Sequence, residues 1–334
     1  MGVKEISDKI RRRVWDKIVT YSRSTPFYPY IYGSFWYSKF ARKGTENIEQ
    51  YFSSVPNPGA GIGHQMANWI AGYWFAQLFG IKFAHIPFSN KIWEDFLGFG
   101  NNETQVNELV KNGKYRKVKL PLFNEGNPIE VNLIRNIISV YKGQKVILVT
   151  EQDQFYKDQF GVQDIIKQKF YSTPSRRDQK LIYSKYYFNI AIHVRRGDIV
   201  SNDGTVNENF NMRFQQNDYF FKVLLSVILN LKVSKPVMIY LFSQGEIDSF
   251  NEFKEFNNIH FCLDMSAINS FLHMVYADLI ITSKSSFSYK PALLSNGIKI
   301  CPANFWHGYP KNDQWILADD NGKFNIQKLN IIHD

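Results

Sequence analysis

Short apolar runs alternate with helical periodicity along the second half of the chain. The strand-like runs and the helical segments between them follow one another as 189–194, 218–231, 237–242, 259–263, 268–276, 279–282, 290–295 and 298–302, the second, fifth and seventh being helical. Short apolar strands separated by helices are typical of a parallel sheet that is covered on both faces. The pattern therefore predicts an α/β domain that binds its ligand at the carboxyl ends of its strands.

The first half of the chain has a weaker pattern. A glycine-rich turn at residues 59–63 leads into the almost wholly apolar segment 66–79, which Gly80 ends, and this predicts a buried helix. Runs 82–86 and 145–150 read as strands, whereas 98–127 has little periodicity. A polar run at 172–180 is the expected linker. A chain of 334 residues usually divides into two domains, so we expect an N-terminal, acceptor-side domain (1–175) and a C-terminal, nucleotide-binding domain (176–334).

The composition indicates a chain that is folded throughout. Apolar residues make up 44% and aromatic residues 16%, which is unlike a disordered segment. The two cysteines, Cys262 and Cys301, lie in apolar runs and are expected to be buried thiols. No stretch resembles a signal peptide or reaches the ~18 apolar residues of a membrane span. We therefore expect a cytoplasmic protein.

The net charge of +10 favours an anionic partner, such as a phosphorylated donor, an acidic glycan or a lipid surface, and nucleic acid is not expected. Near the start of the chain, basic residues alternate with Ile6, Ile10, Val14 and Ile18. This pattern is typical of a packed helix with a solvated basic face, and also of a basic amphipathic helix that lies on an anionic membrane. Peripheral membrane association stays open.

The sequence His193-Val194-Arg195-Arg196-Gly197-Asp198 stands where a predicted strand ends. Polar groups at this position face the ligand crevice of an open α/β sheet. Two adjacent guanidinium groups suit phosphate oxygens and keep their charge near neutral pH. For Arg196 the alternative is an ion pair with Asp198 that only holds the loop.

A second polar turn, Thr282-Ser283-Lys284-Ser285-Ser286-Phe287-Ser288, follows another predicted strand. Hydroxyl and backbone N–H groups at a helix N-terminus bind phosphate, although a serine-rich turn is also an ordinary helix cap. The predicted sheet brings this turn to the same edge as Arg195.

Several familiar signatures are missing from the sequence. There is no Asp-x-Asp pair, no histidine pairing at zinc spacing and no Gly-x-Ser-x-Gly elbow. The glycines at 59, 61 and 63 lack the lysine and serine of a P-loop, so close backbone approach to a ligand is their simplest role. We expect no metal or other cofactor, because positive side chains would supply the charge.

Three motifs resemble the α1,2/α1,6/protein-O-fucosyltransferase superfamily. Residues 59–66 (Gly59-Ala60-Gly61-Ile62-Gly63-His64-Gln65-Met66) are similar to its N-terminal glycine motif, with His64 in place of asparagine, and 193–198 matches its His-x-Arg-Arg motif. Residues 278–288 are similar to its C-terminal motif, with Lys284 inserted. The resemblance implies a GT-B-like fold, with two Rossmann-like domains facing a cleft. It further implies an inverting, metal-independent transfer of fucose from GDP-fucose, the donor substrate, to a glycan hydroxyl.

The resemblance also implies roles for individual residues. The donor-binding set is Gly61, Gly63, His64, Gln65, His193, Arg195, Arg196, Asp264, Ser285, Ser286, Phe287 and Ser288. His193 would touch guanine and Arg195 would hold the β-phosphate, with Arg195 also counted as catalytic. Asp264 is carried over as the residue that reads guanine, although an ungapped match falls on Ser270. The general base falls on Asp203, with Asp198 and His64 as alternatives.

Two other functions remain open at this point. The first is a transferase that uses another sugar nucleotide, because phosphate and base contacts say little about the sugar. The second is a non-catalytic glycan-binding relative, which would not need Arg195 together with an acidic loop residue. The acceptor pocket would form from the N-terminal half.

Overall fold

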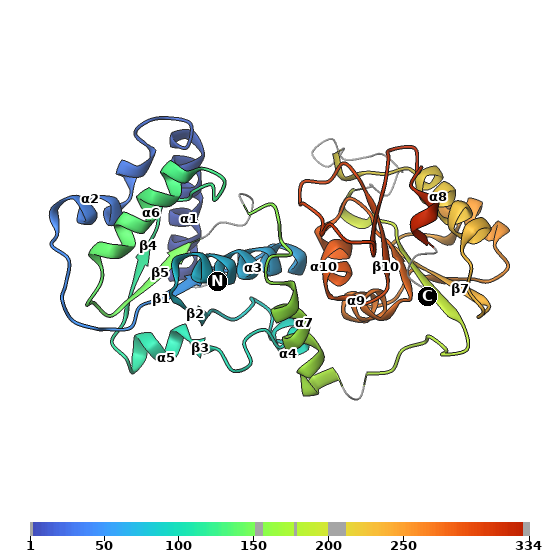
Figure 1. Cartoon of the computed structure of the whole chain (residues 1–334), viewed down its shortest axis with the longest axis horizontal. Coiled ribbons are helices and arrows are strands. Elements are labelled where there is room, and N and C mark those ends of the chain that lie inside the picture. The colour runs from blue at the N-terminus through green and yellow to red at the C-terminus, as the bar shows by residue number, and fades with distance from the viewer. Residues whose placement is uncertain (1–2, 151–155, 177–178, 200–211, 330–334) are drawn as a thin grey trace.

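The computed structural model describes residues 3–150, 156–176, 179–199 and 212–329. The chain forms two α/β lobes that lie side by side (Figure 1). Each lobe is built on one sheet, and every strand pairing in both sheets is parallel. The α/β class expected from the sequence is confirmed.

The N-terminal sheet has the strand order β3-β2-β1-β5-β4. Its strands are β1 (Tyr51–Ser54), β2 (Lys82–His85), β3 (Thr104–Gln105), β4 (Arg116–Lys119) and β5 (Val146–Thr150). The apolar pattern predicted only β2 and β5. β1 is short and half of it is serine, yet all four of its residues are buried at the centre of the sheet.

The helices of this lobe surround its sheet. They are α1 (Val3–Ser22), α2 (Gly33–Phe40), α3 (Ile62–Phe79), α4 (Lys91–Leu97), α5 (Val106–Lys111), α6 (Pro128–Val140) and α7 (Gln163–Ser172), with short 3₁₀ turns η1 (Tyr28–Ile31) and η2 (Pro174–Arg176). The apolar segment is the predicted buried helix, α3. It ends at Gly80, whose φ of 65° is left-handed. It begins at Ile62, so the glycine motif is itself the first turn.

The C-terminal sheet has the order β11-β10-β9-β6-β7-β8. Its strands are β6 (Phe188–His193), β7 (Val237–Phe242), β8 (Ile259–Cys262), β9 (Leu279–Ile281), β10 (Ile298–Pro302) and β11 (Trp315–Ala318). Its helices are α8 (Asn217–Asn230), α9 (Ala267–Tyr276) and α10 (Ser286–Leu294), with 3₁₀ turns η3 (Gly197–Ile199), η5 (Ile247–Glu255) and η6 (Ile326–Leu329). This is the Rossmann strand order, and the chain reverses direction across the sheet between β6 and β9.

Neighbouring residues of β6 point to opposite faces of the sheet and pack in different hydrophobic cores. On β6, Ile190 and Ile192 enter a core confined to the C-terminal lobe, whereas Ala191 faces the other side of the sheet. The core that contains Ala191 continues through Phe271 and Leu293 into the N-terminal lobe, where it includes Phe75. One hydrophobic core therefore joins the two lobes.

The helix α7 belongs to the predicted N-terminal domain but packs on α10 of the other lobe. Gln163 donates from Nε2 to the Leu293 carbonyl at 2.8 Å, and the Tyr171 hydroxyl donates to the Leu294 carbonyl at 3.1 Å. In Figure 1, α7 lies between the lobes, next to α4. Residues 163–172 thus form part of the interface between the lobes.

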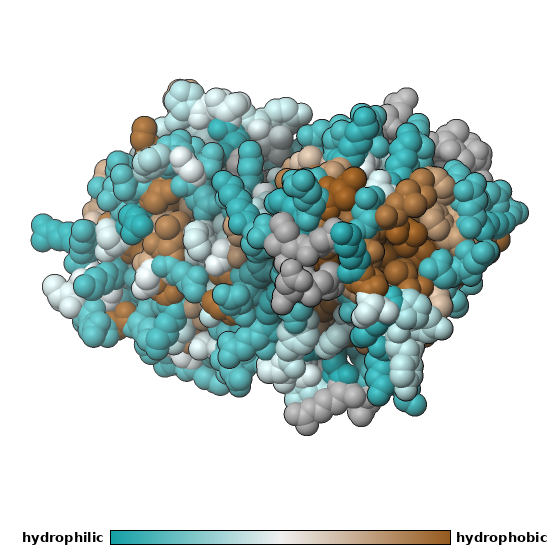
Figure 2. Space-filling view, turned by 45° about the vertical axis from the view of Figure 1, so that its right-hand side comes forward, coloured by the Kyte–Doolittle hydropathy of each residue, from teal (hydrophilic) through white to brown (hydrophobic). Residues whose placement is uncertain are grey.

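Hydrophilic residues cover most of the surface seen in Figure 2, and an apolar area lies on the C-terminal lobe at the right. Cys262 and Cys301 are buried free thiols, as predicted. Burial raises the pKa of each to about 12, so both stay protonated. Among the described residues, no helix has the length and apolar character needed to cross a membrane.

Candidate active site

A cavity of about 650 Å³ lies between the two lobes, at the carboxyl ends of β6, β7 and β9. The N-terminal lobe contributes the first turn of α3, and the C-terminal lobe contributes most of the rest. The lining residues that the sequence predicted are Gly61, Gly63, His64, His193, Arg195, Arg196, Ser285, Ser286 and Phe287. The cavity therefore occupies the point where the strand order reverses, which is where open α/β sheets bind ligands.

Arg195 lies directly beyond β6, and its side chain reaches across the reversal point. Its Nη1 donates to the Ser285 hydroxyl at 3.2 Å. Ser285 caps α10, because its Oγ accepts a hydrogen bond from the Phe287 N–H. The sheet thus joins two motifs that lie 90 residues apart in the chain. A planar guanidinium beside a helix N-terminus is an arrangement that suits a phosphate group.

His193 is the last residue of β6 and is buried. Its Nδ1 lies 2.8 Å from the Ser283 hydroxyl, which in turn lies 3.3 Å from the Ser288 hydroxyl. Burial, and then the charges of Arg195 and Arg196, lower the pKa of His193 to about 3. The imidazole is therefore neutral at physiological pH and can bind a ligand only as a neutral hydrogen-bonding group.

Arg196 lines the cavity but is held by protein groups. Its Nη1 donates to the carbonyls of Arg195 at 2.8 Å and Gln215 at 3.1 Å, and its Nη2 donates to the Asn217 side chain. Burial lowers the pKa of Arg196 to about 10, which leaves it charged at neutral pH. These bonds fasten the loop after β6 to the start of α8, so Arg196 has a positioning role.

Lys284, the insertion in the serine-rich motif, turns away from the cavity. Its Nζ forms an ion pair with Asp320 at 3.0 Å, and its backbone N–H donates to the Gln215 side chain. Ser288 is also withdrawn, because it is fully buried and bonded to Ser283. From the serine-rich turn, Ser285, Ser286 and Phe287 reach the ligand space.

The glycine motif brings the two lobes into backbone contact. A Cβ atom on Gly63 would lie 2.7 Å from the carbonyl carbon and oxygen of Ser286. Gly59 has a φ of 91°, which favours glycine, whereas Gly61 has no atom within 4 Å of an added Cβ. The close approach that the sequence assigned to a ligand is thus made, at Gly63, by the opposite lobe.

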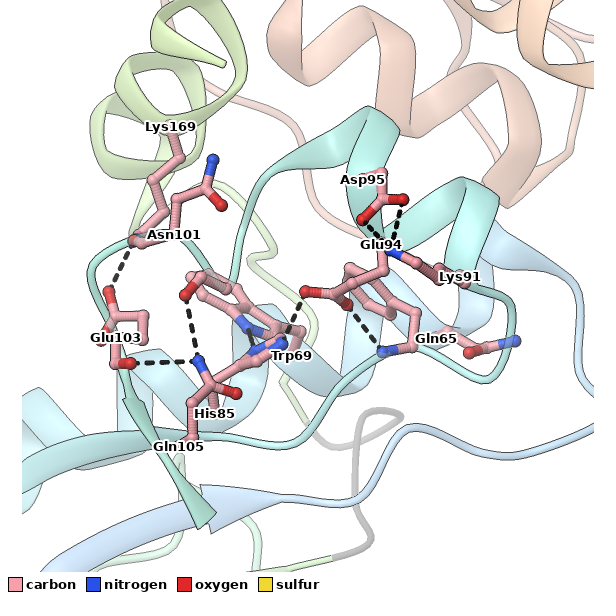
Figure 3. A network of polar contacts seen from close by, with 12 residues as sticks. Gln65, Trp69, His85, Lys91, Glu94, Asp95, Asn101, Glu103, Gln105 and Lys169 are labelled. Carbon is pink, nitrogen blue, oxygen red and sulfur yellow. Dashed lines mark hydrogen bonds and ion pairs between the residues drawn. The ribbon is translucent and has the colours of Figure 1, made fainter. Parts of the chain in front are cut away.

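Gln65 does not line the cavity but hydrogen-bonds to the loop at residues 59–61 that carries the glycines. Its Nε2 donates to the Ala60 carbonyl and to the Ser89 hydroxyl, each at 2.8 Å, and its Oε1 accepts from the Ser89 N–H. Nearby, the Trp69 indole donates to His85 Nδ1 at 3.0 Å, and His85 Nε2 bonds to Glu94 at 2.8 Å (Figure 3). An indole N–H only donates, so the His85 proton is on Nε2. The bond from Gln65 to Ala60 fixes the loop that carries Gly61, and Glu94 holds the segment beside it by accepting from the Phe88 N–H.

The cavity is strongly basic. Among its described lining residues four are basic, Lys157, Arg195, Arg196 and Arg213, and none is acidic. The first turns of α3 and α10 both reach the cavity, and a helix N-terminus carries partial positive charge. The arrangement favours a ligand with several negative charges.

Three other predicted residues are placed differently. Asp264 is exposed and does not line the cavity, whereas Ser270, where the ungapped match falls, is buried in its wall. Asp203 lies outside the described residues. Asp198 has its backbone in η3, but its side chain is outside the described part of the structure. Of the three candidate bases, only His64 is placed, and it lines the cavity.

Sequence reasoning missed several lining residues, among them Lys157, Arg213, Ser243, Gln244, Trp306 and His307. Ser243 and Gln244 directly follow β7, so the rule that identified Arg195 could have found them. Trp306 and His307 follow β10 in an aromatic run, and the Arg213 guanidinium lies 5.2 Å from the Trp306 ring. Lys157 and Arg213 are single basic residues in polar segments and carry no local signal.

No family model matches the sequence, and no curated protein matches it. Solved structures are similar in fold. For apo POFUT1 the TM-score is 0.43 at 12% identity, covering 75% of this chain and 96% of that one. For NodZ alpha-1,6-fucosyltransferase co-crystallised with GDP the TM-score is 0.46 at 11% identity, covering 83% and 98%. For fucosyltransferase NodZ from Bradyrhizobium the TM-score is 0.42 at 12% identity, covering 74% and 93%.

Proposed function

We propose that the chain is an inverting, metal-independent glycosyltransferase that transfers fucose from GDP-fucose to a hydroxyl of a glycan acceptor. The main support is the contact between Arg195 and Ser285 in a basic cavity, at the point where the strand order of the C-terminal sheet reverses. A nucleoside diphosphate leaves such a reaction with added negative charge, which the guanidinium and the start of α10 stabilise. The choice of fucose comes from the motif resemblance.

The reaction needs a base as well as a phosphate clamp. The acceptor oxygen attacks the anomeric carbon, the bond from that carbon to the β-phosphate oxygen breaks, and the base takes the acceptor proton. His64 stands on the α3 side of the cavity, opposite the clamp residues of the C-terminal lobe. Asp203 and Asp198 remain the carboxylate candidates.

A second candidate is a transferase that uses a different nucleotide base. The cavity wall carries Ser270 in place of the acidic residue that reads guanine, and Asp264 is not part of the described lining. A serine can donate or accept, whereas a carboxylate accepts from two guanine N–H groups at once. The choice of base would then depend on neighbours such as Gln244 and His193.

Thermal unfolding with GDP, UDP, ADP and CDP separates these candidates. A ligand that binds only the folded state raises the melting temperature, and at equal concentration the ligand with the higher affinity raises it more. We expect stabilisation by GDP above the other three, and transfer of fucose from GDP-fucose to a glycan acceptor. A preference for another base would overturn the GDP assignment. Binding of glycans without hydrolysis or transfer from any sugar nucleotide would favour a non-catalytic relative.

A further inference from the structure

The long helix α1 carries a run of exposed residues before it reaches the core of the N-terminal lobe. Every residue from Ile10 to Val14 is exposed. The second half is docked, because Trp15 and Val19 pack on the core of the N-terminal lobe and the Trp15 ring lies 5.2 Å from that of Tyr32. Most helices in proteins gain their stability by burying an apolar face. The side of α1 that faces away from Trp15 and Val19 therefore presents a face suited to an external partner.

The exposed face of α1 is apolar along a single stripe. Ile10 is 57% exposed, Val14 51%, Ile18 43% and Tyr21 78%. Their spacings of four, four and three residues place them on one side of a helix. This stripe, Ile10-Val14-Ile18-Tyr21, is called the α1 stripe below.

Basic residues border the α1 stripe on both sides. At 100° per residue, Arg13 and Lys17 fall along one edge of the stripe and Arg11 along the other, and all three are exposed. Asp16, the one acidic residue between Ile10 and Tyr21, follows Val14 by two positions and so lies on the opposite side of the helix. An apolar stripe between two basic edges complements a surface that is apolar within and anionic at its border.

We propose that α1 docks this protein on the surface of an anionic lipid bilayer. The apolar side chains of the stripe enter the boundary between headgroups and acyl chains, while Arg11, Arg13 and Lys17 stay at the level of the lipid phosphates. Docking uses a face that does not line the cavity, so it is independent of the donor site. It would hold the enzyme beside an acceptor that is itself anchored in the membrane.

Vesicle co-sedimentation of the full chain tests the proposal. The probes are vesicles of pure phosphatidylcholine and vesicles of phosphatidylcholine mixed with phosphatidylglycerol. We expect binding to the mixed vesicles, much weaker binding to the neutral ones, and release at high salt, because surface charges are screened. No binding to the anionic vesicles would overturn the proposal, and would leave a protein partner as the occupant of the stripe.

Two variants test the two parts of the surface. The triple change Ile10→Ser, Val14→Ser, Ile18→Ser should abolish binding. Replacing Arg11, Arg13 and Lys17 by Gln should weaken binding to anionic vesicles by roughly 10²-fold, since each basic residue near such a surface contributes about a tenfold factor or somewhat less.

Matched controls come from elsewhere on the surface. Ile129→Ser and Leu229→Ser alter side chains that are 81% and 72% exposed on other helices, and should leave vesicle binding unchanged. Gln at the exposed positions Lys111, Lys114 and Lys311 controls for net charge. Unaltered melting temperature and GDP stabilisation would show that the α1 variants are folded. Vesicle binding by the α1 variants at the parent level would overturn the docking proposal, even if GDP still stabilises the protein. Conversely, loss of vesicle binding in these variants would support docking even if GDP does not bind.

Discussion

Gly63 and Ser286 stand so close that a Cβ atom on Gly63 would lie 2.7 Å from the Ser286 carbonyl carbon. The first residue belongs to the first turn of α3 and the second begins α10, so this contact joins the lobes beside the cavity. The absence of a side chain on Gly63 therefore sets how near the N-termini of α3 and α10 can come to each other beside the cavity.

Gly63→Ala should separate α3 from α10. Because the obstructing atoms are backbone, we expect the free energy of unfolding to fall by about 1–3 kcal/mol, the usual range for overpacking. Donor affinity should fall too. Denaturant unfolding and calorimetry with GDP measure the two effects. Gly61→Ala is the control, because nothing lies within 4 Å of its added Cβ. Equal behaviour of the two variants would contradict the steric role of Gly63.

Arg195→Lys should impair transfer almost as much as Arg195→Ala. A lysine offers one point charge and cannot reproduce a planar fork placed between Ser285 and a diphosphate. We expect turnover to fall by roughly 10²-fold or more in both variants, the scale on which a preorganised donor acts. Lys284→Gln, which removes a charge paired with Asp320 outside the cavity, should change turnover little. Near-parent rates for Arg195→Lys would exclude a two-pronged role.

Replacing the general base should lower turnover while leaving GDP affinity nearly unchanged. If Asp203 is the base, Asp203→Asn keeps GDP affinity and lowers turnover by roughly 10²-fold or more. Asp198→Asn and His64→Ala, measured by the same calorimetry and transfer assay, are the comparison. Transfer by Asp203→Asn at the parent rate would move the role to one of those two residues.

Acid should destabilise the protein through its buried histidines. Burial, with nearby positive charge, lowers the pKa of His193 to about 3 and of His307 to about 2. Both are therefore neutral when folded, whereas in the unfolded chain each takes up a proton below a pH of about 6.5. The free energy of unfolding should thus be highest above that pH and fall as the pH drops towards 3, with each histidine contributing at most about 1.4 kcal/mol per pH unit.

In His307→Gln, the slope of the free energy of unfolding against pH should fall by up to about 1.4 kcal/mol per pH unit, which corresponds to one proton. Urea unfolding between pH 7 and pH 5 measures the slope, and His260→Gln, at an exposed position, is the control. A slope that is the same in His307→Gln and the parent would show that His307 takes up its proton over the same pH range in the folded and unfolded states.

Activity should persist in excess EDTA. The described lining of the cavity offers basic side chains and two helix N-termini to a diphosphate. A transfer assay with and without chelator measures this. Loss of activity that manganese restores would overturn the metal-independent mechanism.

The C-terminal lobe was largely readable from the sequence, since most of its strands are buried on both faces and appear as short apolar runs. β7 and β10 fall at the predicted residues, and β6 and β8 within one residue of them. The position of Arg195 at a strand end was equally local information. β1 escaped prediction because its buried residues include Ser53 and Ser54, so its apolar pattern is short and interrupted.

The sequence did not show which of these residues meet at one cavity. Local periodicity reports which side of an element is buried, but not which elements become neighbours. The sequence placed Ser285 at the same sheet edge as Arg195, but only the strand order makes them neighbours, and the packing of α3 on α10 brings Gly63 to Ser286. Hydrogen bonds within the N-terminal lobe make Gln65 a support of the loop that carries Gly61, and α9 places Ser270 in the cavity wall. The sequence thus determined the chemical groups and their strand-end positions, whereas only the tertiary structure decided which of them share one cavity, because contacts between distant segments depend on the whole fold.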